Sequence, residues 1–205
     1  MAKDANPRKQ PRQERAKATV DAIMKAAAQV LIAEGYENAT TARIAERAGV
    51  SIGSLYQYFP NKEALVAALI ERHSDEIVAT VDEALTATSH ETLEDGMRAL
   101  IHAAVTAHRL DPKLHKILHE QVPRVGRLAK ALDTTRRVTN AIEVFLRQHE
   151  AELKNKRDPA MAALVVETAL EALSHKAVIE RHDLLRSGAF EGEMLSLVTS
   201  YLTGK

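Results

Sequence analysis

Residues 35–69 read GYENATTARIAERAGVSIGSLYQYFPNKEALVAAL, and this stretch decides the fold. Thr40 offers a capping hydroxyl ahead of a helix of about two turns. Gly49 ends that helix, because glycine enters the left-handed region without steric cost. Ser51 can cap a second short helix, which ends at Phe59 because the residue before a proline is disfavoured in helical geometry. Two short helices joined by a glycine-containing turn form the helix-turn-helix pattern.

Within this stretch, AERAGVSIGSLYQYFPNKEAL resembles the DNA-binding core of TetR-family transcriptional regulators, and the match runs from about Thr19 to Leu69. The resemblance implies an all-α chain with an N-terminal three-helix helix-turn-helix domain. A long helix should join it to a C-terminal helical domain that binds a ligand and dimerises. We therefore expect a disordered basic arm at 1–14, a DNA-binding domain at 15–62 and a ligand-binding and dimerisation domain at 63–205.

The second short helix would enter the DNA major groove. Because Leu55 and Phe59 are four residues apart and face the core, Tyr56 lies on the groove side, where its hydroxyl can bond a phosphate. Gln57 can pair with adenine and Arg43 with guanine, although Arg43 also has an interpretation as a surface ion-pair partner. Combined with the resemblance, this predicts a DNA-binding set: Thr40, Thr41, Ala42, Arg43, Ser51, Ile52, Gly53, Ser54, Tyr56, Gln57, Tyr58 and Lys62, with Arg8, Arg12 and Arg15 from the arm.

Formal net charge is zero, with 28 basic and 28 acidic residues, but the charge is unevenly distributed. Residues 1–17 hold six basic side chains against Asp4 and Glu14; the six are Lys3, Arg8, Lys9, Arg12, Arg15 and Lys17. A solvated tail without a role is one interpretation. Beside a helix-turn-helix we favour the other, an arm that reaches phosphates or the minor groove.

The first helix should run from about Arg15 to Glu34, and a long helix from Asn61 to about Thr88 should lead into the second domain. Asp158-Pro159 is a cap followed by proline at the first helical position, and the helix that it opens is apolar nearly all round. Such a helix must be covered on more than one side. It is either fully buried in a monomer or, as the resemblance implies, part of a dimer interface formed by Val165, Ala172, Leu173, Met194, Leu197, Val198 and Tyr201.

The C-terminal domain has few aromatic residues, so we expect an effector pocket with aliphatic walls. The predicted lining is Met97, Ile101, His108, Phe145, Glu167 and Glu171. The pair Glu167 and Glu171 sits on one side of the apolar helix, and three placements stay open: a solvent-facing edge, a pairing with Arg136 or Arg137, or the mouth of the pocket, where the carboxylates would favour a cationic or hydroxyl-rich ligand.

Catalytic motifs are not found in the sequence: there is no glycine-rich phosphate loop, no H-E-x-x-H and no nucleophile elbow. The chain has no cysteine, which excludes disulfides and thiolate metal sites. His115 and His119 are four residues apart and could share a metal, but ordinary surface or pocket histidines are the simpler interpretation, so we predict no metal and no cofactor.

The predicted function is a homodimeric, sequence-specific DNA-binding regulator, a repressor released from a palindromic operator by a small-molecule effector, and not an enzyme. The alternatives are a DNA-binding protein that acts without a ligand and a helical small-molecule carrier that kept the fold. The expected partners are a double-stranded DNA operator, an effector of unknown identity and a second copy of the chain, with no membrane. Because the amino terminus lacks a signal-peptide pattern, we expect a cytoplasmic location.

Overall fold

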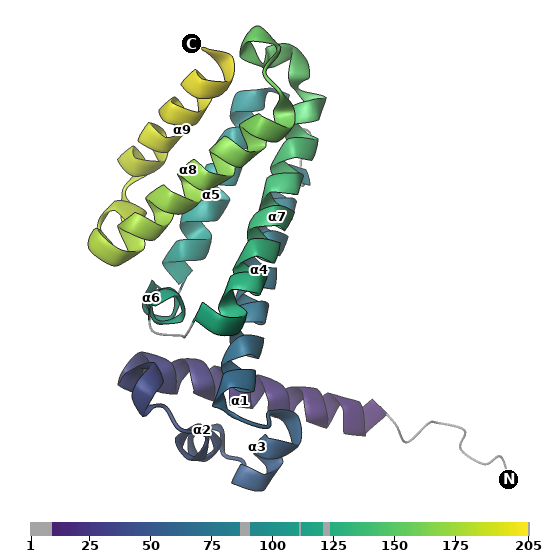
Figure 1. The fold of residues 1–205 in the computed structure, drawn as a ribbon, viewed down its shortest axis with the longest axis vertical. Coiled ribbons are helices and arrows are strands. Elements are labelled where there is room, and N and C mark those ends of the chain that lie inside the picture. Colours follow the sequence, from purple (N-terminus) through teal and green to yellow (C-terminus); the bar gives the residue numbers. More distant parts are fainter. Residues whose placement is uncertain (1–9, 87–90, 111, 121–123, 205) are drawn as a thin grey trace, which may run out of the picture. The chain divides into compact units, whose positions relative to one another are not determined.

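The computed structural model describes residues 10–86, 91–110, 112–120 and 124–204, and these residues are all-α. The α-helices are α1 (Gln10–Asn38), α2 (Thr41–Ala48), α3 (Ile52–Tyr58), α4 (Lys62–Thr86), α5 (Leu93–Leu110), α6 (Pro112–Glu120), α7 (Arg124–Gln148), α8 (Pro159–Glu180) and α9 (Gly188–Thr203) (Figure 1). Short 3-10 turns η1 (Glu150–Glu152), η2 (Lys154–Lys156) and η3 (Leu184–Arg186) connect the last three helices. The predicted fold class is confirmed.

The chain divides into two compact units, residues 1–69 and 70–205. Helix α4 belongs to both, since it begins in the first unit and continues without interruption into the second. The sequence places the domain boundary slightly earlier, at 62/63. No helix within the described ranges combines the length and the hydropathy needed to cross a membrane.

In the first unit, α1 packs on α2, and α2 packs on α3. The buried face of α1 carries Ile23, Ala27, Val30 and Leu31, which follow the helical period. Helix α1 begins at Gln10, earlier than the predicted start at Arg15. Its regular geometry is interrupted at Gly35 (φ 76°, ψ 170°), where the sequence predicts the end of the helix.

In the second unit, α8 contacts α5, α6, α7 and α9, and α9 also packs along α5. Helix α8 is therefore covered on several sides, which explains why apolar residues surround its axis. Asp158 caps it as predicted, with its carboxylate accepting from the backbone N–H groups of Ala160 and Met161, and Pro159 follows at the first helical position. The core of the unit contains Leu100, Ile142 and Leu146, among others.

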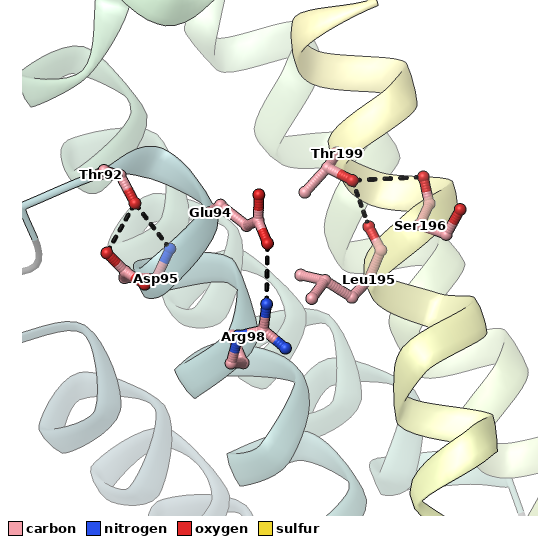
Figure 2. Close-up of polar contacts among 7 residues, drawn as sticks. All are labelled: Thr92, Glu94, Asp95, Arg98, Leu195, Ser196 and Thr199. Carbon is pink, nitrogen blue, oxygen red and sulfur yellow. Dashed lines mark hydrogen bonds and ion pairs between the residues drawn. The ribbon is translucent and has the colours of Figure 1, made fainter. Parts of the chain in front are cut away.

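The start of α5 is stabilised by a reciprocal cap. The backbone N–H of Asp95 donates to Thr92 Oγ1 over 3.2 Å, while Thr92 Oγ1 donates to the Asp95 carboxylate over 2.6 Å (Figure 2). One turn further on, Arg98 pairs with Glu94 at 2.7 Å. On α9, Thr199 Oγ1 returns a hydrogen bond to the Leu195 carbonyl at 2.7 Å, a usual way for threonine to satisfy its hydroxyl inside a helix.

One further boundary differs from what the sequence indicates. Glycine is a poor helix former, so Gly126 would be expected to interrupt the chain after α6, but α7 already begins at Arg124 and includes this glycine. Near a helix start a glycine is tolerated, since the first turn has few intrahelical hydrogen bonds to weaken. The cap expected at Asp111 and the proline at 123 lie outside the described residues, as do residues 89–90 of the helix break expected at 89–92.

Candidate DNA-binding surface and effector cavity

Short-range hydrogen bonds fix both ends of α2 and the start of α3. Thr40 has extended backbone geometry, and its hydroxyl accepts from the Arg43 N–H at 3.3 Å. Gly49 ends α2 in the left-handed region (φ 69°), with its N–H bonded to carbonyls of the last turn. Ser51 then caps α3, accepting from the Ser54 N–H at 3.0 Å. The α2–α3 turn is thus specified by the residues that the sequence analysis singled out.

One side of α3 is anchored in the core of the first unit. Leu55 is fully buried, and Phe59 is buried at the end of the helix. On α2, Ile44 and Ala45 are buried as well. These side chains fix the rotation of α3 about its axis, so its other residues face outward.

The outward side of α3 exposes large side chains that a monomer normally covers. Ile52 is 42% exposed, Tyr56 49% and Tyr58 39%, and Gln57 and Gly53 are exposed beside them. The Tyr56 hydroxyl lies 3.0 Å from Thr41 Oγ1, so the start of α2 and the middle of α3 present adjacent hydroxyls. A surface of this composition has hydroxyl donors for phosphate oxygens, together with an amide and apolar groups for base edges.

Two basic residues of the predicted DNA-binding set, Arg43 and Lys62, have partners in the first unit. Arg43 forms an ion pair with Glu34 on α1. Lys62 donates to the Tyr36 carbonyl at 2.8 Å and lies over the Tyr36 ring, 4.2 Å from its centroid. Arg15 is exposed on α1. Arg8 lies outside the described residues, as does the side chain of Arg12.

The second unit encloses a cavity of about 400 Å³ lined by side chains of α4, α5, α6, α7 and α8. Most of its wall is aliphatic, with Ile70, Ile77, Leu100, Leu118, Val138 and Leu170 among the lining residues. Its polar lining residues are His73, Ser74, His108, His115, Thr134, Thr135, Glu167 and Glu171. A pocket of this size with few polar groups among apolar walls is typical of a small-molecule site.

The histidines of the cavity lie close together. His115 Nδ1 is 3.4 Å from His73 Nε2, and His115 Nε2 is 3.2 Å from His175 Nδ1. The rings of His108 and His115 have centroids 4.7 Å apart. His108 Nδ1 lies 2.8 Å from the Ala104 carbonyl oxygen. A carbonyl only accepts, so this ring nitrogen carries a proton.

Two carboxylates of α8 complete the polar lining. Glu171 Oε2 lies 3.4 Å from His108 Nε2. Burial lowers the pKa of His108, but the nearby Glu171 carboxylate raises it, and the net direction is upward. Glu167 is nearly buried, and burial together with the negative charge of Glu171 raises its pKa to about 7. The cavity therefore holds a pair of carboxyl groups, and the pKa of one of them, Glu167, lies near neutral pH.

Two family profiles match the sequence. The one described as "Bacterial regulatory proteins, tetR family" covers residues 23–69, and the one described as "Tetracyclin repressor-like, C-terminal domain" covers residues 92–202, more than half of the chain. The chain belongs to the TetR family. The profile boundaries agree with the two compact units.

Individual curated relatives match the chain over only part of its length. The transcriptional activator FasR of Mycolicibacterium smegmatis is 34% identical over 98 residues, which are 48% of this chain and 44% of FasR. The chain thus spans about half or less of the length of each of the first curated relatives that it matches.

Solved structures extend the likeness over most of the chain. The fatty acid degradation regulator FadR of Bacillus halodurans has a TM-score of 0.73 at 21% identity, covering 88% of this chain and 94% of FadR. The regulator FadR of Bacillus subtilis in complex with stearoyl-CoA has a TM-score of 0.72 at 20% identity, covering 89% and 98%. At this identity the comparison establishes the TetR-family fold.

Three of the six predicted pocket residues of this TetR-family chain line the cavity: His108, Glu167 and Glu171. The other three, Met97, Ile101 and Phe145, are buried in the core of the second unit. Of the two arginines considered for the acidic pair, Arg136 pairs with Asp133 and Arg137 with Asp75.

Four polar residues line the cavity without having been predicted there: His73, His115, Thr134 and Thr135. A signal was present for His73, which interrupts the apolar stripe of α4. His115 was considered only together with His119, whose side chain is not described.

The predicted dimer residues fall into three groups of exposure. Val165, Ala172 and Leu197 are exposed, Leu173 and Tyr201 are half-buried, and Met194 and Val198 are buried within the chain. The Tyr201 ring also lies against the Arg157 guanidinium, 4.0 Å from the ring centroid. In addition, Met161 and Leu164 on α8 are exposed.

Proposed function

We propose that this TetR-family protein is a homodimeric repressor that binds a palindromic DNA operator through α3 and is released by a small molecule bound in its second unit. The observation that carries the proposal is the outward side of α3. Its core-facing residues fix the helix in place, while Ile52, Tyr56 and Gln57 stand exposed. A second helix of a helix-turn-helix with this orientation is the element that enters the major groove.

Within the predicted contact set, the structure suggests a division of labour. Tyr56 and Thr41 offer hydroxyls to one phosphate, since their oxygens lie 3.0 Å apart. Gln57 and Ile52 supply the base contacts. Arg43 can join them only by leaving Glu34. An exposed ion pair of this kind contributes about 1 kcal/mol or less. A contact between Arg43 and guanine would therefore offset the loss of the ion pair.

The cavity supports the ligand part of the proposal. Its aliphatic walls favour an apolar body, and its hydrogen-bonding groups lie on α4, α5, α6, α7 and α8. The FadR of Bacillus subtilis was solved with stearoyl-CoA, which shows that the same fold accommodates a molecule with a long aliphatic part. For this chain we propose a smaller amphipathic effector, because the cavity volume is about 400 Å³.

The exposed apolar side chains of α8 and α9 support the homodimer. Met161 is exposed, as are Leu164 and Val165 one turn further along α8, and Leu197 on α9. Apolar groups gathered on two neighbouring helices are typical of a protein–protein interface. A second copy of the chain would cover them and place two α3 helices on the two halves of one operator.

The DNA-binding part is tested by selection of bound sequences from random duplex DNA. The expected result is an inverted repeat with half-site centres about 34–36 Å apart, or a multiple of that distance. Gln57→Glu, on exposed α3, should abolish enrichment by repulsion from DNA. Gln148→Glu, an identical chemical change at an exposed position of α7, should preserve it. A folded dimer that enriches no sequence would contradict the proposal.

A further inference from the structure

His108 has a ring nitrogen whose surroundings require a cation. Its Nδ1 donates to the Ala104 carbonyl, so in the neutral ring Nε2 carries no proton and presents its lone pair. The side chain is only 4% exposed, and among the described side chains Nε2 has no partner of good hydrogen-bond geometry. Its neighbour at 3.4 Å is the Glu171 carboxylate, which is also an acceptor. Two acceptors that face each other repel unless a positive charge lies between them.

A proton can bridge two atoms, but this site offers at least three. One ring nitrogen or oxygen from each of His108, His115 and Glu171 lies within 4.8 Å of the other two. In a tetrahedral zinc site with bonds of about 2.0–2.2 Å, neighbouring ligand atoms are about 3.3–3.6 Å apart. The separation of His108 Nε2 and Glu171 Oε2, 3.4 Å, matches that edge. The arrangement therefore suits an ion with several ligands better than it suits a proton.

The supporting contacts are those of a metal site. A histidine that binds a metal usually donates its other N–H to a carbonyl or carboxylate, and His108 does so to Ala104. His115 has a further imidazole beside each ring nitrogen, from His73 and His175, so whichever nitrogen binds, the other has a neighbour that can fix the ring. His108 also lies in the last turn of α5, where unpaired carbonyls favour positive charge.

We propose that His108, His115 and Glu171 bind one divalent first-row transition-metal ion on the wall of the effector cavity. Imidazole and carboxylate ligands without cysteine suit Zn²⁺, Co²⁺, Ni²⁺ or Cu²⁺. All three residues line the cavity, so three protein ligands leave a position for an oxygen or nitrogen atom of a molecule inside it. The ion thereby becomes part of effector recognition, and this last step rests on the proposed function.

The site is tested with tag-free, full-length protein that has been stripped of metal by a chelator and titrated with Zn²⁺ against a chromophoric competitor. We expect one ion per protomer. Glu171→Gln replaces a ligand on a partly exposed side chain, so the fold should persist while the affinity falls about tenfold or more. His108→Gln should lower it similarly.

The matched control is His102→Gln. His102 also belongs to α5 and also pairs with a glutamate, Glu191 at 3.1 Å, but on the surface and outside this cavity. The affinity of the His102→Gln variant for Zn²⁺ should equal that of the unchanged protein. Binding of less than one ion per protomer, or an equal loss in Glu171→Gln and His102→Gln, would overturn the site.

A second measurement separates the site from its regulatory role. The affinity for the selected operator is compared with and without Zn²⁺, for the unchanged protein and for Glu171→Gln. A change of operator affinity on adding Zn²⁺ that Glu171→Gln abolishes supports the role in effector recognition. A bound Zn²⁺ ion that leaves the operator affinity unchanged overturns that role but not the site. Failure to bind any operator contradicts the proposed function, while the titration still decides the metal site.

Discussion

At the scale of single residues, a substitution at Gly53 should change stability and operator affinity in opposite directions. A Cβ atom built on Gly53 would have only Ser51 Oγ nearby, at 3.9 Å, which is an ordinary contact. Alanine is the better helix former, so Gly53→Ala should raise the free energy of unfolding by up to about 0.5–1 kcal/mol. If α3 lies close against base edges, the same methyl group should weaken operator binding. Urea denaturation and fluorescence anisotropy measure the two effects, and tighter binding in the stabilised variant would show that DNA does not approach this residue.

Tyr56 and Gln57 are neighbours with different expected roles. Tyr56→Phe removes the hydroxyl beside Thr41, so it should weaken specific and non-specific DNA alike, because a phosphate contact carries no sequence information. Gln57→Ala should cost about 1–3 kcal/mol at one operator position and relax the preference there. Binding to a panel of single-base operator variants distinguishes them. The same uniform loss from both substitutions would mean that Gln57 reads no base.

At the scale of helices, α5 and α7 touch at a glycine. A Cβ atom on Gly96 would lie 1.9 Å from Phe145 Cζ, a separation that forces the ring to move. Phe145 is buried and also packs on His149 at 4.6 Å between ring centroids. Gly96→Ala should therefore destabilise the protein by about 1–3 kcal/mol.

The control for this prediction is Gly192→Ala. Gly192 lies inside α9, and an added Cβ would meet nothing within 4 Å. It should therefore raise the free energy of unfolding by up to about 1 kcal/mol. Denaturation curves of the two variants should shift in opposite directions, and a shift of Gly96→Ala to higher stability would contradict the contact.

How far the sequence could predict the helices and the site depends on the range of the interactions. The caps at Thr40, Gly49 and Ser51 involve residues three or four apart, so the signal lies in the local sequence. The Lys62–Tyr36 contact joins residues that are 26 apart, and the His73–His115 contact joins residues 42 apart. Such contacts depend on how whole helices pack, and composition or periodicity does not encode them individually. For this reason the ends and the buried side of α3 could be predicted from the sequence, whereas the contacts of His73 and His115 in the cavity could not.

At the scale of the whole molecule, the proposed dimer would bury the exposed apolar side chains of α8 and α9. Leu197 is 52% exposed, so Leu197→Arg should leave the fold intact and produce monomers that no longer protect a full operator. Light scattering and footprinting measure the two outcomes. Val198→Arg is not equivalent, since Val198 is only 2% exposed and a buried unpaired charge should unfold the chain. A folded Leu197→Arg monomer that still protects the whole site would refute the proposed dimer.

The division of α3 into a buried side and an exposed side has a consequence for evolution. Substitutions at Leu55 or Phe59 disturb the core, whereas Ile52 and Gln57 can be exchanged with little change in stability. If α3 reads the operator, duplicated copies of such a gene can acquire new operators one substitution at a time without passing through a poorly folded intermediate. Paralogues that diverge in this way would first lose cross-regulation of each other's targets and only later diverge in their cores.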